Sequence, residues 1–209
     1  MSRPGPLPPA GALALAFRLA EAGLIQFGRF ARPDGTTWPL LVRLRWLPSY
    51  PALLADLANA LAGSLDGALA DRVLTTQEAI PLGVALSLRT SLPMTYPYGD
   101  VRDYTAAFAI EGAYDVGHPT LLLADVLEGA DQAQHLITLA HRVGLQVGDV
   151  LAVLDLGLGA SAQLAANGYR VGTLIALRDL LAPFVEARIL TPAMSATVSH
   201  WLDAVAPGG

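Results

Sequence analysis

The sequence contains no cysteine and no lysine, and each absence restricts the chemistry that the chain can perform. Without cysteine there is no disulfide, thiolate metal site or thiol nucleophile, which fits a reducing compartment. All 13 basic residues are arginine, so no mechanism can use an ε-amine. Charged residues make up only 15% of the chain, the net charge is −5, and like charges form no block. We therefore expect no nucleic-acid partner.

Long apolar runs are also missing, although hydrophobic residues make up 53% of the chain. The longest uncharged stretches have 14 residues and contain proline or glycine, whereas a membrane-spanning helix needs about 20 apolar residues. A signal-like segment at residues 11–17 is interrupted by Arg18 and Glu21 and has no good cleavage site after it. We therefore expect a cytoplasmic protein without membrane association, with 209 residues sufficient for one domain and a sizeable core.

The N-terminal part of the chain predicts a leader, two helices and an extended segment with a turn. Proline and glycine disfavour regular hydrogen bonding in residues 1–10, which we expect to form a flexible leader. Apolar residues recur at helical spacing up to Ile25, and Gly28 is expected to end this helix. Extended sequence flanks a turn at residues 32–35, and Ser49 is the expected N-cap of the second helix.

From residue 71 onward, short apolar runs alternate with helical patterns. Strands that are buried on both faces and joined by helices are typical of a parallel sheet, so the expected fold class is α/β. The expected strands are 72–75, 94–96, 120–124, 150–155 and 171–177, with a further strand within 104–111. The expected helices are 78–89, 128–143, 160–167, 179–187 and 193–204. In such sheets the chemistry lies where strands end and helices begin.

The order and spacing of several segments resemble the orotate phosphoribosyltransferase family of pyrimidine biosynthesis. Residues 22–30 (AGLIQFGRF) resemble the family's AGAIKFGEF, and residues 47–54 (LPSYPALL) resemble its strand-to-helix passage. Residues 80–87 and 92–96 (IPLGVALS, LPMTY) resemble GIPLATALS and GIPMVY. Two later segments, IEG at 110–112 and TLLLADV at 120–126, resemble LIEG and the strand that leads to the phosphoribosyl loop.

This resemblance covers about residues 12–190 and implies a type I phosphoribosyltransferase fold, in which helices flank a central parallel β-sheet beneath an N-terminal hood. It implies a single domain at residues 11–206. The hood spans about 12–45, the core about 46–190 and a C-terminal helix about 191–205. Members of the family are homodimers whose loops cross into the partner, so a homodimer is the implied assembly.

The family's phosphoribosyl loop, DDVITTGGS, corresponds to ADVLEGADQ at residues 124–132. In the family an acidic pair holds the ribose hydroxyls, and small residues let backbone N–H groups cradle the 5′-phosphate. Here Asp125 keeps one acid and Ala124 replaces the other, while Glu128 and Asp131 stand where the phosphate would bind. A like-charge contact at about 4 Å costs about 1 kcal/mol in water, and more in a drier cleft. The resemblance assigns substrate-binding positions to Ala124, Asp125, Glu128, Gly129, Ala130, Asp131 and Gln132.

The family's mobile loop, RKEVKDYG, supplies basic side chains to pyrophosphate and reads YGDVRDYT at residues 98–105. Tyr98 replaces the arginine, a glycine replaces the first lysine, and Arg102 replaces the second. Tyr104 matches one family variant. Arginine can still hold an anion there, but it does not donate a proton as lysine can.

Three further positions that receive anions in the family are changed. The pyrophosphate turn, PTGG, reads TQEA at residues 76–79 and adds Glu78. The family's orotate-contacting arginine corresponds to Leu156, and its base-loop lysine to about Pro33, beside Arg32. A genome bias toward arginine does not explain Leu156 or the added acids.

Because phosphoribosyl pyrophosphate and orotate are anions, these changes together favour a non-catalytic binding or regulatory module. Its partner is expected to be a neutral or cationic small molecule or another subunit. The alternative is an active phosphoribosyltransferase that makes orotidine monophosphate and pyrophosphate, or a modified product, with Arg102, Asp103 and Asp125 as its residues and Mg²⁺ as its cofactor. A phosphate against residues 127–132 would favour the enzyme, whereas Glu128 bonded to its own backbone N–H groups, or Asp131 bonded likewise, would favour the module.

A minor alternative is dinucleotide binding. Residues 157–162 read GLGASA between a strand and a helix, and Asp179 follows Gly159 by 20 residues, which is the spacing of a ribose-binding acid. Only one βαβ unit follows, so a tight strand-to-helix turn is the favoured interpretation. No metal site is predicted, because the four histidines lack ligand spacing. Asp125, Glu128 and Asp131 could bind a divalent cation, but a solvated helix-capping cluster is favoured over it.

Overall fold

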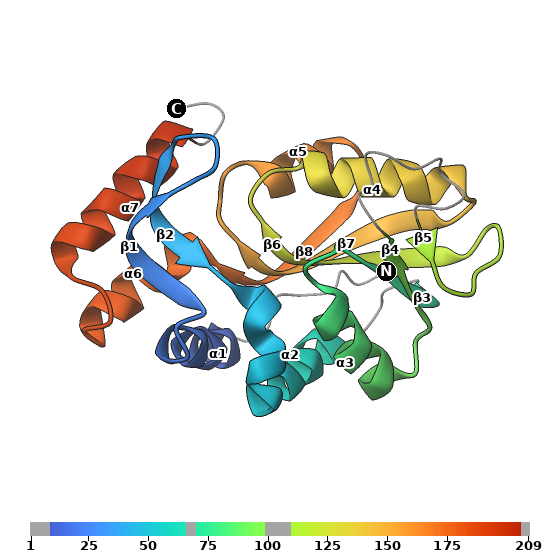
Figure 1. Ribbon diagram of the computed structural model, residues 1–209, viewed down its shortest axis with the longest axis horizontal. Helices are drawn as coiled ribbons and strands as arrows, with labels where there is room; N and C mark the ends of the chain where they lie inside the picture. The colour runs from blue at the N-terminus through green and yellow to red at the C-terminus, as the bar shows by residue number, and fades with distance from the viewer. Residues whose placement is uncertain (1–8, 66–69, 99–109, 206–209) are drawn as a thin grey trace.

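A six-stranded sheet forms the centre of the computed structural model, which describes residues 9–65, 70–98 and 110–205 (Figure 1). Its strand order is β5-β4-β3-β6-β7-β8, and all neighbours are parallel except β5, which runs antiparallel to β4. The strands are β3 (Arg72–Thr75), β4 (Met94–Pro97), β5 (Ile110–Glu111), β6 (Pro119–Leu127), β7 (Gln146–Asp155) and β8 (Arg170–Ala176). The expected α/β fold class with a mostly parallel sheet is confirmed.

Helices cover both faces of this sheet. One face carries α4 (Asp131–Arg142) and α5 (Ala160–Ala166), and the other carries α1 (Pro9–Glu21), α2 (Pro51–Gly63) and α3 (Ile80–Thr90) (Figure 1). The central strands are apolar throughout because their side chains alternate between two buried faces. Leu121 and Leu123 of β6 belong to the core cluster beneath α1, α2 and α3, whereas Leu122 belongs to the cluster beneath α4.

The hood consists of α1 and an antiparallel hairpin of β1 (Ile25–Ala31) and β2 (Thr37–Val42). A 3₁₀ helix, η1 (Leu44–Ser49), connects it to α2, while α6 (Leu177–Glu186) and α7 (Pro192–Val205) pack beside it (Figure 1). Phe184 of α6 is fully buried, with its ring centroid 5.2 Å from Phe17 and 6.0 Å from Phe27. Trp38 of β2 lies 4.8 Å from Trp201 of α7. Aromatic packing therefore fixes the hairpin to the C-terminal helices.

The expected end of the first helix was wrong. The helix ends at Glu21, so Ile25 and Gly28 belong to β1. The stop signal is Gly23, which has a φ of +69°. Its N–H donates to the Ala20 carbonyl at 2.9 Å, and the next N–H, of Leu24, donates to the Leu19 carbonyl at 2.9 Å. These two bonds form a Schellman motif, in which glycine takes the left-handed position that ends a helix.

Other boundaries shifted by a few residues. Helix α1 begins at Pro9, inside the expected leader, and residues 1–8 lie outside the described ranges. Tyr50, not Ser49, is the N-cap of α2, and it makes no side-chain cap bond. Of the strand expected within 104–111, the structure describes Ile110–Glu111. No helix in the described ranges is both long and apolar enough to cross a bilayer.

Candidate functional site

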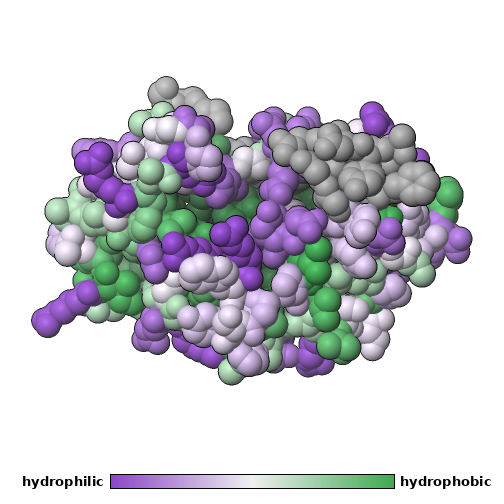
Figure 2. Space-filling model, in the orientation of Figure 1, coloured by the Kyte–Doolittle hydropathy of each residue, from purple (hydrophilic) through white to green (hydrophobic). Residues whose placement is uncertain are grey.

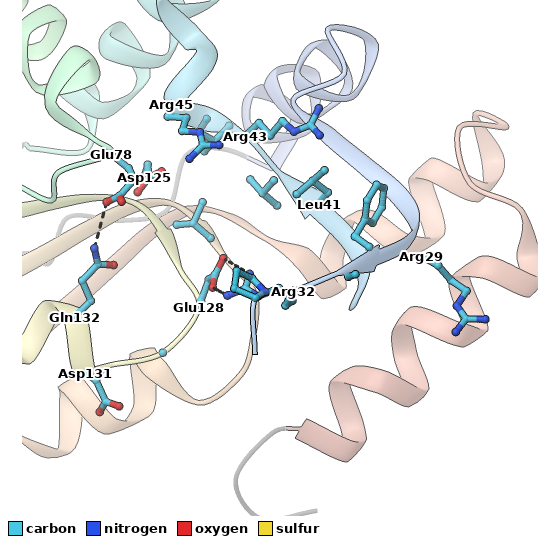
Figure 3. Close-up of a pocket in the computed structure, with 17 residues that line it drawn as sticks. Arg29, Arg32, Leu41, Arg43, Arg45, Glu78, Asp125, Glu128, Asp131 and Gln132 are labelled. Carbon is cyan, nitrogen blue, oxygen red and sulfur yellow. Dashed lines mark hydrogen bonds and ion pairs between the residues drawn. The ribbon is translucent and has the colours of Figure 1, made fainter. Parts of the chain in front are cut away.

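A cleft of about 850 Å³ lies between the hood and the carboxyl ends of the central strands. Strands β3 and β6 are neighbours, so the loops that follow them open into the same space. The sheet-side wall carries acids and an amide, and the hood-side wall carries arginines. Figure 2 shows a hollow beside the hood with hydrophilic residues on its rim. The charged and amide residues of the lining are Glu78, Asp125, Glu128, Asp131, Gln132, Arg29, Arg32, Arg43 and Arg45 (Figure 3).

Asp125, near the carboxyl end of β6, is the acid that the resemblance assigns to the ribose. Thr76, just after β3, places its Oγ1 3.5 Å from Asp125 Oδ1. Burial raises the pKa of the Asp125 carboxyl group to about 6, the negative charges of Glu78 and Glu128 act in the same direction, and a hydrogen bond from the Val126 backbone opposes the rise. The sheet-side wall is therefore strongly negative once this acid ionises.

Glu128 forms an ion pair across the cleft with Arg32 of the hairpin turn. The two guanidinium nitrogens lie 2.9 and 3.3 Å from the two carboxylate oxygens, a bidentate arrangement (Figure 3). The Arg32 guanidinium also lies 4.0 Å from the ring centroid of Trp38. The pair joins residues that are 96 positions apart in the chain. It ties the hairpin turn to the loop expected to bind phosphate.

The rest of that loop differs from what the sequence predicted. Helix α4 begins at Asp131 with Ala130 as its N-cap and no side-chain cap bond. The expected helix-capping cluster was therefore wrong: Glu128 pairs with Arg32, and Asp131 is exposed and points away from it (Figure 3). Gln132 Nε2 donates to Glu78 Oε2 at 3.2 Å, which links the loop after β6 to the turn after β3.

The remaining positions of the loop contribute backbone or core packing. Gly129 is exposed and lines the cleft, whereas Ala124 and Ala130 are buried in the core beneath α4. The missing second acid of the family's pair is thus replaced by a methyl group that points into the core. Within the described part of the chain, no three His, Asp or Glu side chains are placed to hold a metal ion.

Two positions assigned to other ligands lie apart from the cleft lining. Leu156, at the orotate-contacting position, is 1% exposed and belongs to the main core cluster. Its backbone N–H donates to the Leu127 carbonyl at 3.1 Å. Tyr98, directly after β4, is exposed. Arg102, Asp103 and Tyr104 lie outside the described residues.

The glycine motif after β7 forms a tight strand-to-helix turn. Gly157 and Gly159 have φ values of +75° and +90°, which favour glycine. The Asp155 carboxylate closes the turn by accepting hydrogen bonds from the Gly157 backbone, at 2.8 Å, and from the Ser161 hydroxyl. Asp179 is exposed in the first turn of α6. The polar groups of this turn therefore bond to one another.

The arginines of the hood-side wall were largely missed by sequence reasoning, which identified only Arg32 there. Arg29 lies on β1, and Arg43 and Arg45 follow β2, so the hairpin brings all three to the cleft. The Arg43 guanidinium lies 4.5 Å from the ring centroid of Trp46. Arg43 and Arg45 alternate with apolar residues in the sequence, but only the fold shows that they line the same cleft as the acids.

Comparison with known proteins agrees with this architecture, although no family model matches the chain. The bifunctional enzyme PyrF/PyrE of Nostoc sp. is 25% identical over 181 residues, which are 83% of this chain and 36% of that protein. The orotate phosphoribosyltransferase of Natronomonas pharaonis is 28% identical over 165 residues, 78% of this chain and 94% of that protein. The chain thus spans about a third of the bifunctional relative and nearly all of the shorter one.

Solved structures show the same relationship. The UMP synthase of Leishmania donovani superposes with a TM-score of 0.83 at 27% identity, covering 92% of this chain and 42% of that chain. This chain is thus a homologue of orotate phosphoribosyltransferases in sequence and is similar in fold to a UMP synthase.

Proposed function

We propose that this homologue of orotate phosphoribosyltransferases does not transfer phosphoribosyl groups and instead uses its cleft as a non-catalytic binding or regulatory module. The observation that carries the proposal is the bidentate ion pair between Arg32 and Glu128. Glu128 places a carboxylate in the loop that would cradle the 5′-phosphate, and Arg32 already neutralises this carboxylate. A phosphate that entered would have to displace this pair.

The surrounding charges act against a polyanion in the same way. Glu78 stands in the turn expected to bind pyrophosphate and, with Glu128, raises the pKa of Asp125. At least three acids therefore face one end of the cleft. Each like charge at about 4 Å costs about 1 kcal/mol in water and about 4 kcal/mol at the lower dielectric near a protein surface. Phosphoribosyl pyrophosphate carries several negative charges, so its binding is strongly disfavoured there.

An active transferase is the second candidate, and the position of Asp125 favours it. This acid lines the cleft at the end of β6 beside Thr76, as ribose binding requires. Mg²⁺ commonly binds through one or two carboxylates plus substrate phosphates. Asp125 fits that role if the substrate supplies the remaining oxygen ligands.

The test is calorimetric titration with phosphoribosyl pyrophosphate and Mg²⁺, followed by an assay for orotidine monophosphate. We expect neither binding nor turnover in the wild-type chain. The double variant Glu128→Thr/Asp131→Gly restores the residues of the family's loop, and we expect it to gain affinity for phosphoribosyl pyrophosphate. Glu186→Thr removes an exposed acid at the end of α6 and serves as the control. Micromolar binding and turnover by the wild type would overturn the proposal in favour of the transferase.

A further inference from the structure

The two walls of the cleft carry opposite charges that the protein pairs only in part. Arg32 and Glu128 neutralise one another. Glu78 receives one amide hydrogen bond from Gln132, and Asp125 lies next to the Thr76 hydroxyl. Both are carboxylates with further acceptor capacity, and no arginine within the described residues forms an ion pair with either.

Arg29 and Arg45 are the cleft-lining arginines without an ion-pair or ring partner among the described residues, and Arg29 points away from the acids (Figure 3). Arg45 follows β2 at the start of η1 and lines the cleft (Figure 3). Among the residues that the structure describes, it has no carboxylate or ring partner, whereas Arg43 stacks on Trp46. The Arg45 guanidinium group and two incompletely bonded carboxylates, Glu78 and Asp125, thus line the same volume of about 850 Å³.

These charges restrict the ligands that can bind. An anion would meet Glu78 and Asp125, and a cation would leave the exposed Arg45 without a charged partner. A neutral ligand would displace water from the charged groups of both walls without supplying an opposite charge to either. Removing water from an unpaired charged group costs free energy. A ligand with an ammonium group and a carboxylate satisfies both walls. The apolar side chains of Leu41, Leu44 and other lining residues can cover its hydrocarbon part.

We propose that the cleft binds a small zwitterion of the amino-acid type, whose ammonium group contacts Asp125 and Glu78 and whose carboxylate contacts Arg45. This inference rests on the proposed non-catalytic function of the same cleft, since a phosphoribosyl substrate would occupy the same volume. The charged groups fix the orientation of the ligand, and the apolar lining accepts its side chain.

The experiment uses three probes that share one aromatic body: L-phenylalanine, 2-phenylethylamine, which lacks the carboxylate, and 3-phenylpropanoate, which lacks the ammonium group. We expect calorimetric titration of the full chain at pH 7 to show that phenylalanine binds at least about tenfold more tightly than either fragment, a difference of about 1.4 kcal/mol. Equal affinities, or no binding of phenylalanine, would overturn the proposal.

Two variants assign the contacts. Arg45→Gln should weaken phenylalanine about tenfold or more and leave 2-phenylethylamine unchanged. Asp125→Asn should weaken the binding of phenylalanine and 2-phenylethylamine together, and should not weaken that of 3-phenylpropanoate, because it removes a like charge. Arg188→Gln, at an exposed position after α6, is the matched control for charge. If the two cleft variants weaken all three probes equally, their effect is structural and the proposed contacts are wrong.

Phosphoribosyl pyrophosphate with Mg²⁺, titrated in parallel, separates this inference from the proposed function. Binding of phenylalanine without binding of the pyrophosphate supports both. If neither ligand binds, only the proposed zwitterion site is overturned. Binding of phosphoribosyl pyrophosphate with turnover to orotidine monophosphate overturns the non-catalytic function, whatever phenylalanine does.

Discussion

Replacing Asp125 with asparagine should stabilise the protein in a specific pH window. Burial raises the pKa of this carboxyl group from 3.8 to about 6 in the folded state. Between these two values the folded state holds a proton that the unfolded state has released. Stability of the wild type therefore falls as pH rises from about 4 to about 6, and the full cost is present above about 6. Asparagine carries no charge, so the variant avoids this loss.

The size of the effect follows from the shift. Each pKa unit corresponds to about 1.4 kcal/mol, so a shift from 3.8 to about 6 gives an upper value of about 3 kcal/mol. The side chain is only partly buried, and solvent screening reduces the expected gain to about 1–2 kcal/mol at pH 7.5. The Thr76 hydroxyl can still donate to the asparagine oxygen, so the substitution removes charge with little change in hydrogen bonding.

Urea denaturation of both proteins at several pH values between 4 and 8 measures the difference. We expect nearly equal stability at pH 4 and a growing advantage of Asp125→Asn up to about pH 6.5. Asp131→Asn is the control, because this exposed acid in the first turn of α4 favours the helix dipole. Its replacement should destabilise slightly. A stability difference for Asp125→Asn that does not vary with pH, or that favours the wild type at pH 7.5, would refute the argument.

Two further substitutions test the packing. Gly83→Ala in α3 would place a methyl group 2.3 Å from Thr75 Cγ2 and 2.9 Å from Met94 Sδ, so thermal unfolding should show a loss of about 1–3 kcal/mol. Gly63→Ala, in open space at the end of α2, should instead be neutral or stabilising by up to about 1 kcal/mol, and equal effects at the two sites would contradict the steric explanation. Arg170→Met leaves the buried carboxylate of Asp149 without its ion-pair partner and should cost about 3 kcal/mol in urea denaturation, while Arg170→Met/Asp149→Leu should recover most of that loss. No recovery in the double variant would show that packing, not charge, causes the loss.

The sheet could be predicted from the sequence because its strands are short apolar runs bounded by turns. Residues 72–75 form β3 as predicted, and the strand expected at 171–177 differs from β8 by one residue at each end. Such strands are buried on both faces, so local composition alone marks them. The end of the N-terminal helix was predicted wrongly because the apolar periodicity continued through Gly23 into the next strand. The buried residues of that strand mimic helical spacing over a few positions.

The side-chain contacts across the cleft were harder to predict. The sequence placed Glu128 in the phosphate loop, but its partner, Arg32, lies 96 residues earlier. That contact depends on the angle of the hairpin, which the stacking of Trp38 on Trp201 helps to set. Local patterns do not encode a contact between distant segments, so sequence reasoning treated Glu128 as a helix-capping acid.

Two pairs of cleft residues join segments that are distant in the sequence. Glu128 after β6 contacts Arg32 in the hairpin turn, and Glu78 after β3 contacts Gln132 at the start of α4. Contacting substitutions are not additive, because each changes the cost of its partner. Replacing one member of either pair leaves the charge or amide of the other member without its partner at the cleft. The effect of a substitution at one of these positions therefore depends on which residue occupies the position of its partner.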